Sequence, residues 1–187
     1  LYAVTTNGDT TSRHRYDANG NRTWAWFVGD STVSAWYDAQ DRLDSLWVVE
    51  QDASRIQYAY TAAGELHQRV AGTDTTCYAY DALGNLLQVV QPTGDTIRYL
   101  VDGRNRRVGR QANAAWTHRW LYGNQLNVGA ELAGDSVAAR DVYGTRGHVP
   151  DYVVKGDSTY RLVTAQLGSV RAVVNAATGT VAERIAY

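Results

Sequence analysis

The chain has 187 residues, of which 44% are hydrophobic and 20% are charged, and its formal net charge is −1. This balance is that of an ordinary folded protein, so it argues against wholesale disorder and against a basic surface for nucleic acid or an anionic membrane. Thirteen Tyr and six Trp stand against one Phe and two Pro. Aromatic side chains with a polar edge are typical of half-solvated β-sheet surfaces, so the composition predicts a β-rich protein.

A six-residue pattern recurs along the chain. It occurs as YDANGN at 16–21, YDAQDR at 37–42, YTAAGE at 60–65 and YDALGN at 80–85, with spacings of 21, 23 and 20 residues. A fifth copy begins at Val101-Asp102, and WLYGN (120–124) and DVYGT (141–145) continue the rhythm in looser form. A repeat of this length predicts a tandem array of one supersecondary unit.

Each unit is predicted to be a strand, a tight turn and a second strand. Before the turn, IQYAY (56–60) and CYAY (77–80) place Tyr at alternate positions, on one face of a strand. After it, LDSLWVV (43–49) and LLQVV (86–90) are apolar and rich in β-branched residues. Less regular Gly/Asp turns return the chain, at VGDS (28–31), EQDAS (50–54), AGTD (71–74), PTGD (92–95), LAGD (132–135) and ATGT (177–180). Because no helical period is found, we expect an all-β fold of about eight β-hairpins in one curved antiparallel sheet.

The turn is expected to have two marked positions. An Asp opens it, since its carboxylate can accept a backbone N–H two residues on, and a residue with positive φ closes a three-residue loop through a bulge. The opening positions are Asp17, Asp38, Thr61, Asp81 and Asp102, where the Thr hydroxyl would make a weaker bond. Three residues after them stand Gly20, Asp41, Gly64, Gly84 and Asn105, the residue types that best tolerate left-handed backbone. The Tyr residues that precede four of these turns are Tyr16, Tyr37, Tyr60 and Tyr80.

No catalytic or metal-binding constellation stands out. The four His residues are scattered along the chain, at His14, His67, His118 and His148, whereas zinc needs about four clustered ligands. Cys77, the only Cys, lies in a strand-like run without a basic partner nearby and is expected to be an inert thiol. Ser169 follows Gly168 but lacks the Gly-x-Ser-x-Gly elbow of hydrolases. We expect no enzymatic activity and no cofactor.

Four aromatic residues are the candidate binding residues: Trp36, Trp47, Tyr58 and Tyr78. The favoured interpretation is that they pair with aromatic neighbours across strands and stiffen the sheet, at about 0.2–1 kcal/mol a pair. The alternative is a platform on which sugars stack. The Arg residues at 104, 106, 107 and 110 alternate with apolar neighbours and are expected to form a solvated strand face rather than a nucleic-acid surface.

A Tyr-Asp repeat with a following Gly at this spacing resembles the YD-repeat or Rhs family, which includes shell subunits of bacterial Tc toxins and the teneurin ectodomain. Residues 1–140 match the repeat, and residues 141–187 resemble the start of the Rhs-associated core. In this second segment VPDY (149–152) and LGSVRAVV (167–174) are the more specific pieces. One departure is Ala165, which stands where an acidic residue is expected before QLGS.

The resemblance implies a long sheet of hairpins that winds in a spiral and closes into a hollow shell, which is a structural scaffold. In bacterial members the shell encloses or displays a C-terminal toxin segment of the same chain, and the core can end in a self-cleaving site built from aspartates. That site would lie beyond Tyr187. The chain starts at Leu1 and contains no Met, so we expect a piece of a longer bacterial protein that is secreted or held at the cell surface.

The expected partners follow from the same resemblance. They are the C-terminal toxin segment of the parent chain, the neighbouring repeats and, in the alternative of an adhesion module, cell-surface glycans. No apolar run is long enough to cross a bilayer. Unpaired strands at both ends of a cut array would associate with other chains.

Overall fold

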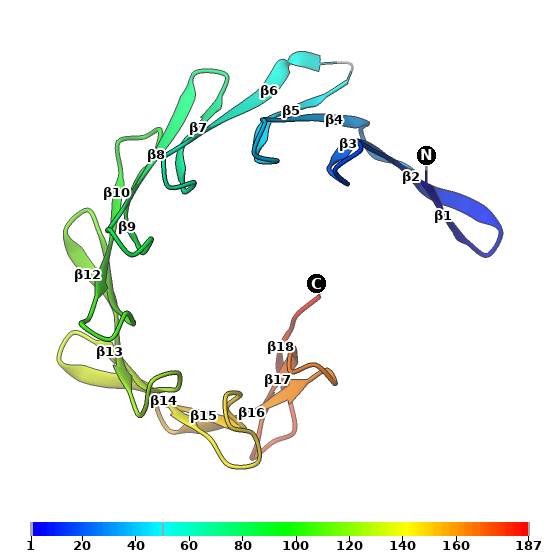
Figure 1. Cartoon of the computed structure of the whole chain (residues 1–187). Helices are drawn as coiled ribbons and strands as arrows, with labels where there is room; N and C mark the ends of the chain where they lie inside the picture. Colours follow the sequence, from blue (N-terminus) through cyan, green and yellow to red (C-terminus); the bar gives the residue numbers. More distant parts are fainter. Residues whose placement is uncertain (1, 50, 187) are drawn as a thin grey trace. The chain divides into compact units, whose positions relative to one another are not determined.

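The computed structural model describes residues 2–49 and 51–186, and for residues 52–54 it describes the backbone without the side chains. These residues form strands and turns, and no helix occurs among them (Figure 1). The described part of the chain accordingly holds no helix of the length and apolarity that a membrane crossing requires. The chain divides into two compact units, Leu1–Asp95 and Thr96–Tyr187.

Each unit is a run of antiparallel strands in chain order. The first unit contains β1 (Tyr2–Thr6), β2 (Asp9–Tyr16), β3 (Arg22–Phe27), β4 (Val33–Tyr37), β5 (Leu43–Val48), β6 (Gln51–Tyr60), β7 (Leu66–Ala71), β8 (Asp74–Tyr80) and β9 (Leu86–Val90). The second contains β10 (Thr96–Val101), β11 (Arg107–Ala112), β12 (Ala115–Tyr122), β13 (Val128–Ala133), β14 (Ser136–Val142), β15 (Tyr152–Lys155), β16 (Ser158–Thr164), β17 (Val170–Asn175) and β18 (Val181–Arg184).

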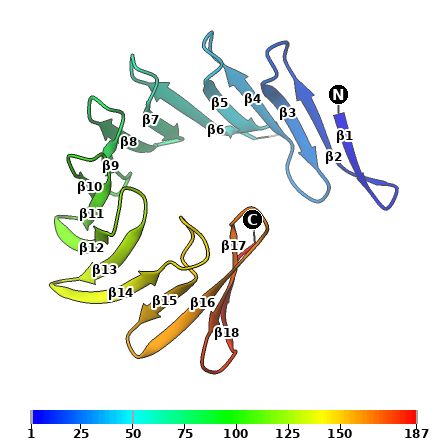
Figure 2. The same ribbon diagram turned by 60° about the horizontal axis from the view of Figure 1, so that its bottom comes forward.

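Within each unit every strand pairs with the strand that follows it, so each unit is a single-layer meander (Figure 2). The prediction of an all-β antiparallel fold is confirmed. Successive strands of a meander run in opposite directions, so the Tyr-Asp turns lie along one edge of each unit and the return turns along the other.

The register shows how the Tyr-Asp turn sets each hairpin. The residue before the turn pairs with the residue six positions later, across a bulge, in Tyr16–Arg22, Tyr37–Leu43, Tyr60–Leu66, Tyr80–Leu86, Val101–Arg107 and Tyr122–Val128. Five residues therefore lie between the paired positions of every one of these hairpins. A constant turn length holds the alternation of side chains constant from one hairpin to the next.

One predicted return turn is wrong in its extent. The segment 50–54 was expected to be a turn, but β6 already begins at Gln51, which pairs with Val48. The connection is thus only two residues long, and the polar residues that suggested a longer turn are strand positions. Glu50 itself lies outside the described residues.

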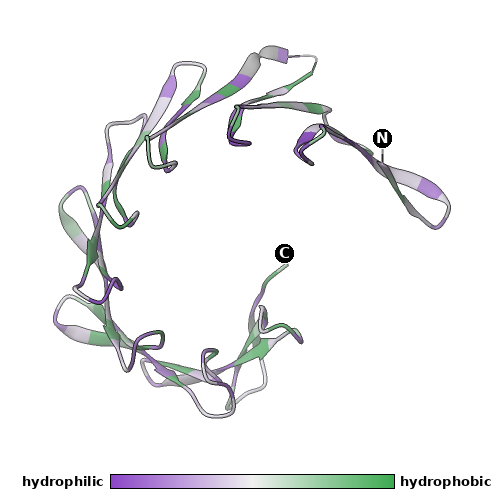
Figure 3. Cartoon of the chain, viewed as in Figure 1, coloured by the Kyte–Doolittle hydropathy of each residue, from purple (hydrophilic) through white to green (hydrophobic). Residues whose placement is uncertain are grey.

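Neither unit contains a conventional core. The buried hydrophobic residues of the described chain are Ala25 and Ala35, the buried polar ones are Ser12, Ser45 and Asn127, and no large side chain is fully buried. Figure 3 shows hydrophobic and hydrophilic residues mixed along the strands. Because an isolated hairpin is marginal in water, each hairpin must gain its stability from contacts with the hairpins beside it.

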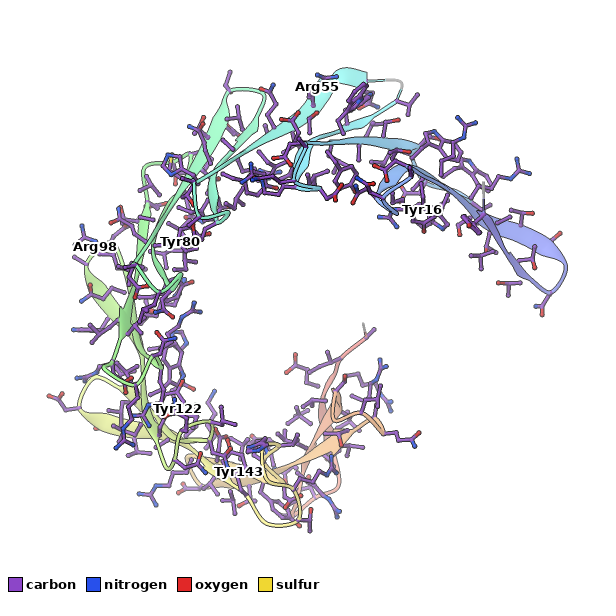
Figure 4. All side chains as sticks on the ribbon, in the orientation of Figure 1. Tyr16, Arg55, Tyr80, Arg98, Tyr122 and Tyr143 are labelled. Carbon is purple, nitrogen blue, oxygen red and sulfur yellow. The ribbon has the colours of Figure 1, made fainter. Side chains whose placement is uncertain are left out.

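Each unit, taken by itself, is curved, and Figure 4 distinguishes its two faces. Tyr16 and Tyr80 lie on the concave face of the first unit and Arg55 on its convex face, while in the second unit Tyr122 lies on the concave face and Arg98 on the convex one. The strand β14 runs across residues 140 and 141, so no break in the sheet accompanies the division of the sequence into 1–140 and 141–187. That division stays a prediction from the sequence pattern.

Candidate functional site

The Tyr-Asp turns have one geometry. In the four turns that open with Asp, the Oδ1 atom of the Asp accepts the N–H groups of the second and fourth residues after it, at 2.8–3.0 Å. The backbone closes the turn twice, as in the turn at 81–85, where Asp81 N donates to Asn85 O and Gly84 N donates to Asp81 O. The residues three after the opening position all have positive φ: Gly20 (91°), Asp41 (60°), Gly64 (101°), Gly84 (81°) and Asn105 (64°).

The turn at Thr61 keeps this geometry with other groups. Thr61 N donates to Glu65 O and Gly64 N donates to Thr61 O, as in the Asp turns. The Thr61 Oγ1 atom accepts one backbone N–H, that of Glu65 at 3.2 Å, and its hydroxyl donates to the Glu65 carboxylate. Where an Asp carboxylate accepts two backbone N–H groups, the Thr61 hydroxyl therefore accepts one. A hydrogen bond between the Thr61 and Glu65 side chains takes the place of the second.

The fourth residue after the Asp is a further structural position that the sequence interpretation missed. Asn85 Nδ2 donates to the second oxygen of Asp81 at 2.8 Å, and Arg42 and Arg106 pair with Asp38 and Asp102 at 2.7 Å. The signal was present in the sequence, because this position holds Asn, Arg or Glu in all five copies. These partners occupy the carboxylate oxygen that the backbone leaves available.

In three hairpins the Tyr that precedes the turn links the hairpin to the one before it. The hydroxyl groups of Tyr37, Tyr60 and Tyr122 donate to the backbone carbonyls of Arg22, Leu43 and Arg107, at 3.2, 2.8 and 3.1 Å. In each case the acceptor is the first strand residue after the preceding turn. In two of the three cases an Arg of the preceding turn also stacks on the Tyr ring, with Arg42 4.7 Å from the Tyr60 centroid and Arg106 4.8 Å from the Tyr122 centroid. At these two junctions Tyr, Asp and Arg therefore form one contact between successive repeats.

These hydrogen bonds make the turns sensitive to acid. The backbone N–H of Arg42 and then its side chain hold the pKa of Asp38 below its ordinary value of 3.8, and the side chain of Arg106 does the same first of all to the pKa of Asp102. Since the pKa is lower in the folded chain than in the unfolded one, the stabilisation is complete above about pH 5 and is lost as the pH falls through the folded value. We expect the free energy of unfolding to drop between about pH 5 and about pH 2.

Urea unfolding across this pH range, followed by circular dichroism, tests the effect. The double variant Asp38→Asn/Asp102→Asn should be less stable at the upper end of the range and should lose less stability on acidification. The control is Asp157→Asn, which changes an exposed carboxyl in the turn between β15 and β16. An unchanged acid dependence in the double variant would show that these carboxylates do not stabilise the fold.

The turn at Ala165 forms without an acid. Ala165 N donates to Ser169 O at 2.7 Å, Gly168 N donates to Ala165 O at 2.9 Å, and Gly168 has a φ of 91°. The departure from the expected acidic residue thus removes the side-chain acceptor but not the backbone turn. In the longer loop between β14 and β15 the acceptor is Asp151, at the end of the loop instead of its start. Its carboxylate accepts hydrogen bonds from the N–H and the hydroxyl of Thr145, both at 2.7 Å.

The four aromatic candidates do not share one surface. Trp36 pairs with Ser45 of β5, and Trp47 lies two residues further along that strand, so the two Trp side chains share a face. Arg55 stacks on Trp47 and lies on the convex face (Figure 4), so this shared face is the convex one. Ser45 in turn pairs with Gln57, so Tyr58 lies on the opposite, concave face. The register of β6, β7 and β8 puts Tyr78 on that concave face as well.

Trp36 and Trp47 line a groove of about 450 Å³ at the edge of the first unit that carries the Tyr-Asp turns. Its polar lining comes from the two neighbouring turns, chiefly Asp17, Asn19 and Asp41. Asp41 Oδ1 accepts the amide groups of Asn19 and Asn21 at 2.8 and 2.7 Å, which joins the two turns. This groove is a candidate binding site.

The described residues contain no group of three or more His, Cys, Asp or Glu side chains that is arranged to hold a metal ion. Three His side chains contact polar neighbours: Ser12 with His14 at 3.0 Å, Glu131 with His118 at 3.4 Å and Asn127 with His148 at 3.1 Å. Cys77 is half-buried, with its Sγ atom 3.9 Å from Gln68 Nε2. The candidate sites are therefore the turn contacts between repeats and the Trp36 groove.

Comparison with known proteins places the fold. The model of the teneurin YD-shell family matches residues 1–187. Among solved structures, the chain is similar to one in the Photorhabdus luminescens Tc holotoxin pore with a TccC3 variant (14% identity, TM-score 0.51) and to one in TcdB2-TccC3-Cdc42 (16% identity, TM-score 0.51). Each similarity covers 91% of this chain and 9% of the solved chain, so it concerns a small part of those proteins, and at these identities it shows the fold alone. No curated protein matches the chain.

Proposed function

Because this chain belongs to the teneurin YD-shell family, we propose that it is a segment of the wall of a hollow shell that encloses the C-terminal toxin segment of a secreted bacterial protein. The observation that carries the proposal is the contact between successive repeats. Tyr60 reaches back to Leu43, and Tyr122 reaches back to Arg107, in the same way. A contact that repeats with the sequence can extend a wall for as many hairpins as the chain supplies.

The single layer supports the same role. A sheet without a core behind it leaves both faces available, one to the inside of a shell and one to the outside. The concave faces carry Tyr16 and Tyr80 in the first unit and Tyr122 in the second, and such side chains offer amphipathic contacts for a chain that has not folded. The scaffold role needs no catalysis by these residues, and we propose none.

The alternative of a sugar-binding adhesion module has less support. It required Trp36, Trp47, Tyr58 and Tyr78 to form one platform, whereas two of them lie on each face. An enclosing wall uses the concave pair, Tyr58 and Tyr78, as part of its inner lining. It leaves the convex pair for a separate role.

Photo-crosslinking tests the proposal in the gene product that contains this chain together with whatever sequence follows Tyr187. A benzophenone amino acid is placed at Tyr80 or Tyr122 on the concave faces, and at Arg55 or Arg98 on the convex faces as matched controls. We expect intramolecular crosslinks to the C-terminal segment from the two Tyr positions and not from the two Arg positions. Crosslinks from the convex positions, or from all four alike, would contradict enclosure.

A further inference from the structure

The convex face of the first unit carries four of the six Trp residues, and three of them bear a stacked guanidinium. Arg15 lies 5.1 Å from the centroid of Trp24, Arg13 lies 5.8 Å from that of Trp26, and Arg55 lies 4.6 Å from that of Trp47. Since Trp24 pairs with Ser34, two residues before Trp36, all four rings lie on one face. A cation over an indole ring is attracted by the negative face of the ring.

Trp36 is the exception on this face. It is 64% exposed, and no Arg or Lys stacks on it in the part of the chain that the structure describes. Its neighbour across β5 is Ser45, which is small and only 3% exposed. One side of the Trp36 ring therefore remains open to a binding partner.

The sheet opens beside this ring. Strands β3 and β4 pair only at Trp24–Ser34 and Ala25–Val33 in their described residues, so the two strands are not paired towards their Tyr-Asp turns. The groove of about 450 Å³ lies there and reaches from Trp36 to the turn residues Asp17 and Asp41. It is thus bounded by an aromatic ring and by carboxylates.

The charge of the groove favours a cation. Asp17, Asp38 and Asp41 line it, and among the described residues only Asp38 of these three forms an ion pair with a cation, Arg42. Asp41 is exposed, and its Oδ1 atom accepts hydrogen bonds from two neutral amides. The charge of Asp41 is therefore not neutralised by these contacts.

The chain itself shows which group fits such a place. The Arg42 guanidinium lies between the Asp38 carboxylate, at 2.7 Å, and the Tyr60 ring, at 4.7 Å. Arg106 lies in the same way between Asp102 and Tyr122, at 2.7 and 4.8 Å. A planar guanidinium can stack on a ring and bind a carboxylate in the same position, which an ammonium does less well. The Trp36 groove supplies a ring and a carboxylate without the guanidinium between them.

We propose that the Trp36 groove is a docking site for an arginine side chain of a partner protein, at the edge of the first unit that carries the Tyr-Asp turns. The chemical class of the ligand is a guanidinium on a peptide chain. A sugar would stack on the same ring and donate hydroxyl hydrogen bonds to the same carboxylates, but a neutral sugar would leave their charge without a counterion. The Trp36 ring lies on the convex face, while Ala35 and Tyr37, on the opposite face of β4, also line the groove.

The test uses the isotopically labelled chain and the peptide acetyl-Gly-Gly-Arg-Gly-Gly-amide, followed by the indole N–H signal of Trp36 in NMR spectra. The same peptide with citrulline has nearly the same shape but no charge. We expect the Arg peptide to shift the Trp36 signal and the citrulline peptide to bind about tenfold more weakly, since the cation–π contact and the charge are both lost. Binding of the Arg peptide should weaken as salt is added.

Variants locate the site. Trp36→Ala should abolish binding, Trp36→Phe should retain part of it, and Asp41→Asn should weaken it several-fold while keeping a residue that tolerates positive φ. The matched control is Trp116→Ala in the second unit, where the ring already has Arg119 5.8 Å from its centroid. Equal binding of the citrulline peptide, or unchanged binding by Trp36→Ala, would overturn the proposal. A Trp36 shift with maltohexaose and none with the Arg peptide would make the groove a sugar site instead.

Discussion

Replacing Tyr60 with Ala should lower the free energy of unfolding by about 2 kcal/mol, which is roughly half of what a fully buried aromatic residue loses on truncation to Ala. The side chain is half-buried, and burial raises the pKa of its hydroxyl above the ordinary value of 10.0. It donates to Leu43 O at 2.8 Å and carries Arg42 on its ring. The Ala variant therefore loses apolar contact area, a hydrogen bond and a cation–π contact between two hairpins.

Tyr60→Phe separates the ring from the hydroxyl. It keeps the ring and its contact with Arg42 but leaves the carbonyl of Leu43 without this donor, which we expect to cost about 1 kcal/mol. The control is Trp36→Ala, since Trp36 is 64% exposed and its removal should change the stability by less than about 0.5 kcal/mol. Urea unfolding gives all three values.

Hydrogen exchange shows where the loss acts. If the Tyr joins neighbouring hairpins, the amide groups of β5 should exchange faster in Tyr60→Ala, although the substitution is in β6. A loss confined to β6 and β7, or a cost no larger than that of Trp36→Ala, would mean that the Tyr does not link the repeats.

The turns could be predicted from the sequence because their determinants are local. The carboxylate of Asp81 and the left-handed backbone of Gly84 are three residues apart, and each residue type favours that conformation in any hairpin. Asp41 and Asn105 stand where other copies have Gly, and both have positive φ. Such substitutions indicate a backbone requirement more clearly than an invariant Gly would.

The contacts between repeats could not be predicted in the same way. The hydroxyl of Tyr60 meets the carbonyl of Leu43 seventeen residues earlier, which requires the lengths of two strands and a bulge to be known together. Which aromatic side chains share a face of the sheet could not be predicted either, for the same reason. Alternation puts Trp36 and Tyr37 on opposite faces of β4. Whether Trp36 and Tyr58 share a face, however, depends on the register of β4, β5 and β6. A single-residue shift in that register would have put the four aromatic residues on one face, as the alternative of a sugar platform required.

Replacing Gly64 with Ala tests the left-handed position in isolation. Gly64 has a φ of 101°, and an added Cβ atom would meet nothing within 4 Å. Any destabilisation must therefore come from the backbone conformation, and we expect a loss of about 1–2 kcal/mol. Gly84 is a less clear site for this test, because its Cβ atom would lie 3.7 Å from Glu65 Oε1.

The matched control is Gly103→Ala, in the turn that Asp102 opens. Gly103 also has nothing within 4 Å of an added Cβ atom, but its φ is not in the left-handed region. Loss of a Gly restricts the unfolded chain in both variants, so Gly103→Ala should be neutral or stabilising by up to about 1 kcal/mol. Urea unfolding of the two variants should thus give effects of opposite sign. Equal effects would mean that positive φ does not set the cost at this turn, and that Asp41 and Asn105 need no backbone explanation.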